Sequence, residues 1–433
     1  MAAGEGKDGL LVGTSQVDIT PPVGTALAGS LRPRDSDGVQ DPLYAKAIVL
    51  ESQGVKLAYV GLDLIALARE HGDRAVAQAS ECTGIPEESI VWSATHTHTG
   101  PYTAALYSNE HETINREWLD SLPENFAQCV RDADASKVSA RFSRTTGCQT
   151  GVSHNRRVRL KDGRHINTWN LAGKTEHVQC VGSAGPIDPE IGILGFEDVA
   201  GRLLAVLFNF ALHTNTNFGS LFSADYPGVV AARIRERFGP QVTTLFAAGA
   251  CGDINTANRT YRQVGDLLSQ DIVGELERRT PVGGGVRLGV VKREVTVPRR
   301  DFVADQEARI RNSGWRPEDQ EIFRRELEIM RQQGRTQDKS ILQAWRIGDV
   351  GFASLPGELF VEWGLKIKQQ SPFPWTYPVE LGGDYLGYLV TEQAWEGGGY
   401  ESLIARTAMP APGGVADMVD TALEMLKELH GAC

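Results

Sequence analysis

The chain has 433 residues, of which 41% are hydrophobic and 23% are charged, as is usual for a water-soluble globular protein. Its formal net charge is −11. It has no basic stripe that could neutralise phosphates, which excludes a nucleic-acid partner. No window approaches the roughly eighteen uninterrupted apolar residues of a transmembrane helix, so none is expected.

The six cysteines are scattered along the chain, and none forms a Cys-x-x-Cys pair. This spacing argues against both a disulfide scaffold and a thiolate zinc site. Residues 1–8 lack the apolar stretch of a signal peptide. We therefore expect a cytoplasmic protein, or a secreted one whose leader has been removed, and the sequence leaves a homo-oligomer open.

Strand and helix patterns alternate through the first third of the chain. A hairpin is indicated where two apolar runs flank Ser52-Gln53-Gly54. Pro123 lies inside a helical pattern, where we expect a kink or a restart. The predicted strands are 11–13, 17–20, 45–50, 56–63 and 90–94, and the predicted helices are 70–83 and 117–133.

Residues 137–185 have weak periodicity, which predicts short strands and long loops. Alternation resumes after them. A charged, solvent-exposed helical pair is expected over 305–333, with a break near Gly314. The other predicted strands are 191–196, 203–212, 243–248, 343–347 and 351–355, and the other predicted helices are 226–238, 263–280, 359–369 and 415–430.

The alternation indicates an α/β protein. Because several neighbouring strands are joined as hairpins, we expect a mixed β-sheet flanked by helices rather than a purely parallel one. No linker divides the chain. We predict a single large catalytic domain over 10–405, with a helical tail over 406–433 that packs on it.

Four predicted extended segments end at residue types that bind metals. These residues are His96 and His98, His213, Glu358, and either Tyr385 or Tyr388. Catalytic zinc is held by about three nitrogen and oxygen ligands, with one position left open for water. The pattern thus fits a metal hydrolase, but a single histidine at a strand end is more often a hydrogen-bonded core residue.

The segment from Ser93 to Pro101, Ser-Ala-Thr-His-Thr-His-Thr-Gly-Pro, closely resembles a signature of the neutral, non-lysosomal ceramidases. Further segments resemble that family in the same order, from about residue 10 to 405. They are 13–21, Asn155-Arg156, 187–190, 212–215 with 223–225, 246–255, Leu355-Pro356-Gly357-Glu358, 385–388 and 398–401.

The resemblance implies zinc bound by His96, His213, Glu358 and Tyr388. It implies that His98, Arg156 and Tyr400 line the site as substrate and transition-state contacts. The expected reaction is hydrolysis of an amide (N-acyl) bond in a ceramide-like or smaller substrate by metal-activated water. The alternatives are an ester, lactone or glycosidic bond at the same metal, or a non-catalytic binding protein.

One position departs from the family pattern. The family's serine follows a Gly-Asp pair by two residues, whereas this chain has Asn255 there. An amide cannot act as a nucleophile, so we expect the chemistry to rest on metal-activated water. We also expect Asp63, Asp225 or Asp253 to orient a histidine, and the loops 32–40, 104–111 and 171–183 to shape the pocket.

Overall fold

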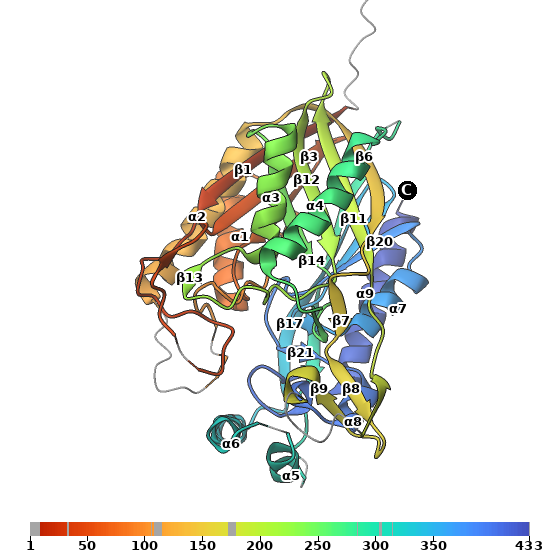
Figure 1. The fold of residues 1–433 in the computed structure, drawn as a ribbon. Helices are drawn as coiled ribbons and strands as arrows, with labels where there is room; N and C mark the ends of the chain where they lie inside the picture. The colour runs from red at the N-terminus through yellow and green to blue at the C-terminus, as the bar shows by residue number, and fades with distance from the viewer. Residues whose placement is uncertain are drawn as a thin grey trace, which may run out of the picture.

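The computed structural model describes residues 9–32, 34–104, 106–107, 115–171, 179–283, 285–302, 305–313 and 315–432. Its largest element is an eight-stranded sheet (Figure 1). In sheet order the strands are β14 (Thr243–Ala248), β12 (Leu203–Phe210), β11 (Glu190–Asp198), β6 (Val138–Cys148), β1 (Leu10–Asp18), β3 (Tyr44–Ser52), β4 (Val55–Leu62) and β5 (Ile90–Ala94). The β12–β14 and β4–β5 pairs are parallel and the others are antiparallel, which confirms the predicted mixed sheet.

A four-stranded sheet packs against this large sheet. Its strands are β16 (Leu288–Pro298), β17 (Gln337–Ile347), β18 (Val350–Ser354) and β20 (Trp375–Val379). The indole of Trp345 stacks between Tyr59 of the large sheet and Phe352 of its own sheet, with centroids 5.8 and 5.0 Å away. A core between the two sheets explains why strands of both read as nearly continuous apolar runs.

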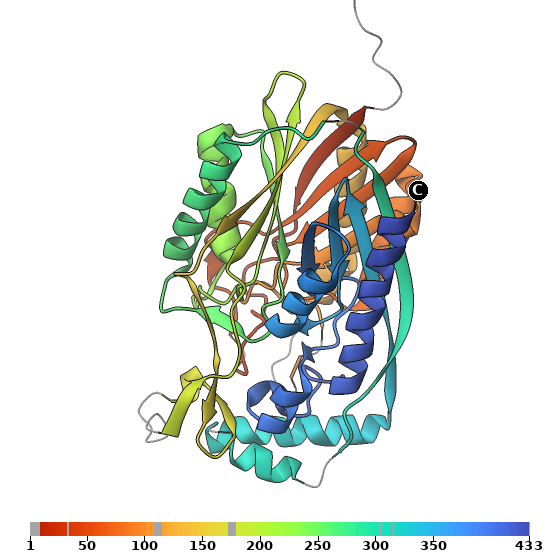
Figure 2. The same cartoon turned by 90° about the vertical axis from the view of Figure 1, so that its right-hand side faces the viewer.

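Helices cover the outer faces of both sheets, which gives a layered α/β/β/α arrangement (Figure 2). Helices α1 (Arg69–Thr83) and α2 (Arg116–Ala135) pack on the β1–β3–β4 part of the large sheet. Helices α3 (Asp225–Phe238) and α4 (Tyr261–Glu277) pack on its β11–β12–β14 part. Helices α7 (Val361–Gln370) and α9 (Pro412–Gly431) cover the four-stranded sheet.

Helices α5 (Gln306–Arg311), α6 (Pro317–Gln333) and α8 (Glu392–Gly397) lie at the bottom of Figure 1. The short strands pair as β2 (Gly38–Val39) with β13 (Leu221–Phe222), β7 (Ser153–Asn155) with β15 (Ile254–Thr256), β8 (Arg157–Leu160) with β9 (His165–Asn167) and β10 (Cys180–Ser183), and β19 (Glu358–Leu359) with β21 (Tyr388–Leu389).

Most of the predicted helices and strands occur in the structure. Strand β5 has the predicted bounds, and α1, α3 and α9 differ from prediction by a few residues. Helix α4 begins two residues early. Thr260 and Gln263 form a capping box that was not recognised in the sequence, and it fixes the start of the helix at Tyr261.

Three local expectations were wrong. Helix α2 continues through Pro123, because its buried Leu119, Leu122 and Phe126 hold it on the sheet despite the lost backbone hydrogen bond. The region 137–185 begins with β6, an eleven-residue strand, rather than with short strands. Helix α6 is not simply solvent-exposed, since it buries Phe323, Leu327 and Met330.

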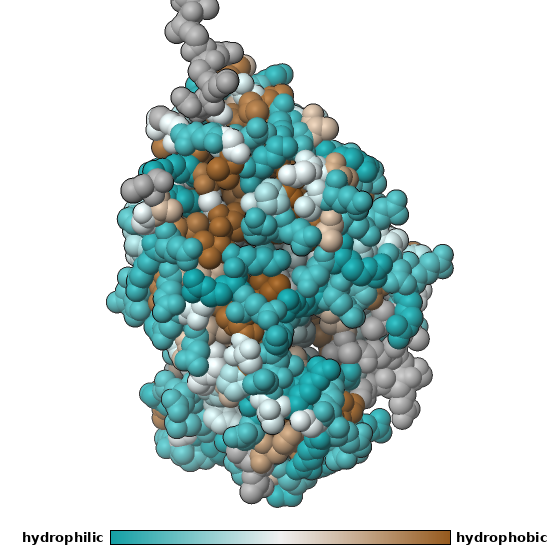
Figure 3. Space-filling model, turned by 180° about the vertical axis from the view of Figure 1, so that it is seen from behind, coloured by the Kyte–Doolittle hydropathy of each residue, from teal (hydrophilic) through white to brown (hydrophobic). Residues whose placement is uncertain are grey.

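On the face seen in Figure 3, hydrophilic residues predominate, and hydrophobic ones gather in small groups. Within the described ranges, no helix combines the length and the apolar character needed to cross a membrane.

Helix α9 lies within residues 406–433, the predicted helical tail, and forms one outer layer of the fold. Its Val419, Met425 and Leu426 are fully buried against the four-stranded sheet.

We expect Leu426→Ala to lower the free energy of unfolding by about 2–5 kcal/mol, because it leaves a cavity. The control is Lys427→Ala at an exposed position. It should change the free energy of unfolding by less than about 0.5 kcal/mol. Urea unfolding measures both, and equal effects would contradict this packing.

Candidate metal centre

The ends of three strands are joined at the centre of the molecule. The Ala94 N–H at the end of β5 donates to Leu381 O (3.1 Å), and the Glu380 N–H donates to Ala248 O at the end of β14 (2.9 Å). The Gly249 N–H in turn donates to Phe210 O at the end of β12 (3.0 Å). The segments that follow β5, β12 and β14 therefore enter one small volume on rigid supports.

Three histidines meet in this volume. The Nε2 atom of His96 lies 2.9 Å from Nε2 of His213 and 3.4 Å from Nε2 of His98. The three candidate ligand atoms lie within 4.8 Å of one another, so the group could hold a metal ion. His96 and His213 are buried, and His98 is partly exposed. His98 thus lies in the nitrogen cluster itself, whereas the resemblance implied only a substrate contact.

Backbone carbonyls fix the tautomer of each ring. Nδ1 of His96 lies 2.7 Å from Ile65 O, Nδ1 of His98 lies 2.9 Å from Gly29 O, and Nδ1 of His213 lies 3.0 Å from Cys251 O. A carbonyl oxygen only accepts, so each Nδ1 carries a proton and donates it. In a neutral ring the lone pair is then on Nε2, the atom that faces the other two rings.

The histidines are not oriented by the aspartates that the sequence suggested. Asp63 pairs with Lys46 (2.9 Å), and Asp253 accepts from the Asn155 side-chain amide (2.6 Å). Asp225 accepts from the backbone N–H groups of Thr216 and Asn217. The orienting groups are main-chain carbonyls, and residue types carry no information about where those carbonyls lie.

The electrostatics of the cluster favour one positive charge. Burial acts most strongly and would lower the pKa of His96, but the charge and hydrogen bond of Glu358, the charge of Glu380 and the bond to Ile65 O together raise that pKa. Burial, then the charge of His96, holds the pKa of His98 and of His213 well below the usual range. Three converging lone pairs repel one another unless a proton or a metal cation lies among them.

Glu358 adds an oxygen to the nitrogen cluster. Its Oε2 lies 3.3 Å from His96 Nε2 and 3.6 Å from His213 Nε2. The carboxylate is buried, and its Oε1 accepts a hydrogen bond from the Tyr385 hydroxyl at 2.9 Å. Two or three imidazole nitrogens with one carboxylate oxygen form a donor set that zinc accepts.

The structure gives the two candidate tyrosines different positions. Tyr385 contacts Glu358, as described above. Tyr388 is the register partner of Glu358 in the β19–β21 pair, so both enter the site side by side. The guanidinium of Arg156 lies 5.3 Å from the Tyr388 ring centroid. Tyr388 is therefore near the cluster, and Tyr385 supports the carboxylate.

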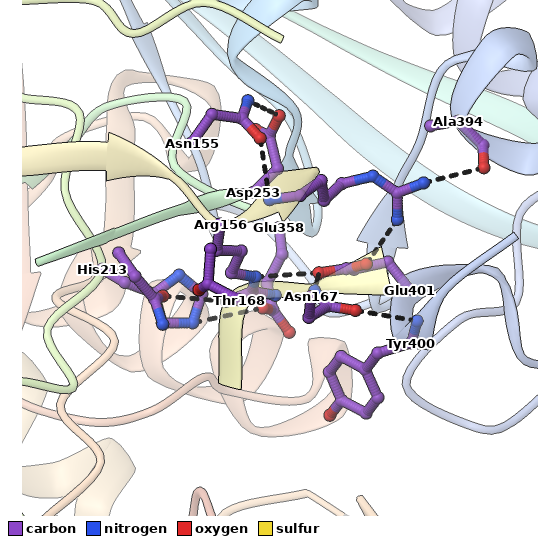
Figure 4. Close-up of polar contacts among 12 residues, drawn as sticks. Asn155, Arg156, Asn167, Thr168, His213, Asp253, Glu358, Ala394, Tyr400 and Glu401 are labelled. Carbon is purple, nitrogen blue, oxygen red and sulfur yellow. Dashed lines mark hydrogen bonds and ion pairs between the residues drawn. The ribbon is translucent and has the colours of Figure 1, made fainter. Parts of the chain in front are cut away.

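Arg156 is held by a buried carboxylate that the sequence analysis did not assign. Its Nε donates to Glu401 Oε1 at 2.8 Å, and Asn167 donates to the same oxygen at 2.8 Å. In Figure 4, Arg156 lies between His213 and Glu401. Glu401 is fully buried, and it directly follows Tyr400 in a segment that resembles the ceramidases, which could have identified it.

A cavity of about 280 Å³ opens onto this cluster. His98, His213, Arg156 and Tyr388 line its inner end. Besides Tyr388, its lining includes the aromatic residues Tyr107, Trp169, Phe218, Trp315 and Tyr400. The structure thus brings His96, His98, His213, Glu358, Tyr388, Arg156 and Tyr400 close to one another, and their roles as ligands or substrate contacts stay predictions.

Two of the three predicted pocket loops reach this cavity. Arg32 lines it from the first loop and Tyr107 from the second. Parts of these loops, residues 33, 105, 108–111 and 172–178, lie outside the described residues. Trp169 and Trp315 also line it, although the sequence carried no motif for either.

The backbone around the histidines is under local constraint. His96 has φ = +66°, a left-handed conformation that is rare for residues other than glycine and common at functional sites. Gly29 has φ = +84°, and a Cβ atom there would lie 2.4 Å from Nδ1 of His98. The carbonyl of residue 29 can support His98 only because this residue is a glycine.

This chain is similar to neutral ceramidases in part of its sequence and in its fold. No protein-family model matches the chain. A 200-residue segment, 44% of this chain, is 24% identical to the neutral ceramidase of Pseudomonas aeruginosa and spans 28% of that protein's length. The crystal structure of neutral ceramidase from Pseudomonas aeruginosa superposes with a TM-score of 0.74, 17% identity, and coverage of 98% of this chain and 75% of that chain.

A second solved structure, a ceramidase complexed with C2, gives a TM-score of 0.73 at 18% identity, with 98% and 75% of the two chains covered. This chain shares the fold of neutral ceramidase. The resemblance inferred from its motifs is confirmed.

Asp225 makes protein stability depend on pH. Burial raises its pKa to about 6, although its hydrogen bonds oppose that shift. In the unfolded chain the value is about 3.9, so the native state binds more protons between about pH 4 and 6. Its contribution to stability therefore falls as pH rises through that window.

The measured quantity is the difference in free energy of unfolding between wild type and Asp225→Asn. We expect this difference to fall by up to about 1.4 kcal/mol per pH unit between about pH 4 and 6. Asparagine tolerates the left-handed φ of +57° at this position. Denaturant unfolding from pH 4 to 7 measures this difference, and a constant difference would contradict the raised pKa.

Proposed function

We propose that this protein is a zinc-dependent hydrolase that cleaves an amide (N-acyl) bond in a ceramide-like or smaller substrate. The observation that carries the proposal is the convergence of the Nε2 atoms of His96 and His213 with Oε2 of Glu358, with Nε2 of His98 beside them. This arrangement presents lone pairs to a single point, as a metal requires. The similarity to neutral ceramidase supports the amide bond.

We assign the zinc to His96, His213, Glu358 and Tyr388, with His98 beside them. When bound, zinc lowers the pKa of a coordinated water to about 7 and polarises the bond to be cleaved. Nε2 of His98 carries a lone pair and lies on the cavity side, so it can accept the proton of the attacking water. The same nitrogen then returns the proton to the leaving amine.

Arg156 and Tyr400 line the cavity as hydrogen-bond donors for the charge that develops on the substrate oxygen. Thr407 Oγ1 donates to the Tyr107 hydroxyl (3.2 Å), and this hydroxyl bonds to that of Tyr400. If each hydroxyl donates onward, the Tyr400 proton is left pointing into the cavity. The Thr407–Tyr107 pair would thereby keep Tyr400 a donor.

The residue at the position of the family's serine, Asn255, supports water as the nucleophile. The Asn255 Oδ1 accepts from Arg156 Nη1 at 3.2 Å and from the Asn215 amide at 3.4 Å. Asn255 therefore holds Arg156. The nearby Cys251 thiol is fully buried and donates to Glu380 at 2.9 Å. Burial, then the charge of Glu380, raises the pKa of this thiol well above its usual range, which leaves it unreactive.

The purified protein should contain about one zinc per chain, measured by elemental analysis. It should hydrolyse N-acyl amides only in the metal-loaded form, so a chelator should abolish activity and added zinc should restore it. His96→Ala should lose both metal and activity. The matched control is His430→Ala, which alters an exposed histidine on α9 and should retain both.

Ester, lactone and glycosidic substrates are tested in the same assay. If the protein hydrolyses one of these substrates but no amide, the proposed bond type is wrong, and the proposed metal site is retained. Native protein without stoichiometric metal, or an active His96→Ala variant, would rule out a metal hydrolase.

Arg156→Lys should lower kcat/KM by about 10²–10³-fold, because lysine cannot keep the planar contacts to Glu401 and Asn255 while facing the substrate. Bound zinc should stay at the wild-type level. Arg164→Lys, at a half-exposed arginine that pairs with Asp162, serves as the control. Steady-state kinetics measure both variants. Equal kcat/KM values for Arg156→Lys and wild type would remove Arg156 from the mechanism.

A further inference from the structure

Glu380 lies in the segment that joins the ends of β5 and β14, and its side chain is fully buried. Its Oε2 accepts the backbone N–H groups of Cys251 and of Leu359, each at 3.1 Å. Its Oε1 accepts the Cys251 thiol at 2.9 Å. One carboxylate therefore joins two stretches of main chain that are more than a hundred residues apart.

Both stretches lead directly to the candidate metal centre. The carbonyl of Cys251 faces His213 Nδ1, and so sets the orientation of that ring. Leu359 follows Glu358, whose carboxylate lies beside His96 and His213. A shift of either stretch would move a ligand atom relative to the others.

The two stretches are also packed tightly against each other. The Gly252 N–H donates to Leu359 O at 2.9 Å. A Cβ atom at residue 252 would lie 2.5 Å from Glu358 O. Asp253 Oδ1 accepts the N–H of Val361 at 2.9 Å. Glu380 adds a further link, because its carboxylate accepts from Cys251 in one stretch and Leu359 in the other. The spacing of the two stretches therefore depends on where this carboxylate lies.

A carboxylate is a costly way to satisfy two backbone amides. Within the described ranges, no arginine or lysine forms an ion pair with Glu380. A buried carboxylate without such a cation carries a large desolvation cost. That cost attaches to the charge alone, so what this side chain supplies to the two stretches is the position of its accepting oxygens.

We propose that Glu380 is a positioning residue: its carboxylate oxygen and the length of its side chain set the spacing between the Cys251 carbonyl that orients His213 and the ligand Glu358. This inference rests on the proposed metal site. It names a residue outside the ligand set and concerns reach and hydrogen bonding rather than charge.

Two substitutions separate these properties. Glu380→Gln removes the charge but keeps an oxygen at the same reach, so it can still accept both backbone N–H groups. Glu380→Asp keeps the charge but is one methylene shorter, so it cannot reach both. Each variant of the full chain is stripped of metal and titrated with Zn²⁺ against a competing chelator. The free energy of unfolding is measured in excess chelator.

We expect Glu380→Asp to weaken zinc binding by about 10–100-fold, and Glu380→Gln to stay within about threefold of wild type. Asp198→Ala is the control, because Asp198 also accepts two backbone N–H groups, from Ala200 and Arg202. It lies in the β11–β12 turn, at the opposite end of β12 from His213. Its loss should lower stability without changing zinc affinity.

The reverse order, with Glu380→Gln weak and Glu380→Asp like wild type, would show that charge rather than reach matters and would overturn the inference. Wild-type affinity in both variants, or an equal affinity loss in Asp198→Ala, would overturn it too. In all these cases the wild type still binds zinc, so the proposed function stands. A wild-type protein that binds no zinc would instead overturn both proposals.

Discussion

Three hydrogen bonds from imidazole Nδ1 atoms to backbone carbonyls define the centre of this molecule. Each carbonyl comes from a different stretch of chain: Gly29, Ile65 and Cys251. Together they turn three Nε2 lone pairs toward one point, at the inner end of the cavity. Such an arrangement is unfavourable by itself, and it becomes favourable when a cation is bound. The free energy of metal binding and the precision of the surrounding fold are therefore linked.

The layered fold supplies that precision. Strands β5, β12 and β14 are buried on both faces. Residues 380–381 tie the end of β5 to that of β14, and the Gly249 N–H ties the end of β14 to that of β12. Side chains at the ends of such strands have little freedom to move, which suits a constellation of ligands. The left-handed backbone conformation of His96 costs free energy locally, and the packing of these strands maintains it. The packing of the strands therefore determines the geometry of the site.

Much of this could be predicted from the sequence, because histidines and a glutamate directly after apolar strands form a local pattern. The bounds of β5 followed from its apolar run. The pattern alone left the histidines open as core residues, and it was the family resemblance that implied a shared site for His96, His213 and Glu358. The partners of these residues could not be predicted in the same way. Which carbonyl faces a given ring depends on tertiary contacts, and so does the choice between Tyr385 and Tyr388.

Other groups escaped prediction for related reasons. Glu380 interacts mainly with backbone amides, and Glu401 with arginines distant in sequence, so neither has a local pattern. Helix α6 appeared solvent-exposed because charged residues dominate its composition, although one of its faces is apolar. Pro123 suggested a break in α2 that packing against the sheet prevents.

The wall of the cavity and its inner end come from different parts of the chain. The wall includes Trp315, Arg316 and Asp319, from α6 and the residues just before it, whereas the histidines follow strands of the large sheet. Selection can therefore alter the chemistry that the opening admits without disturbing the nitrogen cluster beneath it. In the proposed hydrolase, the residues that meet the entering substrate and those that hold the metal would thus be separate in the chain.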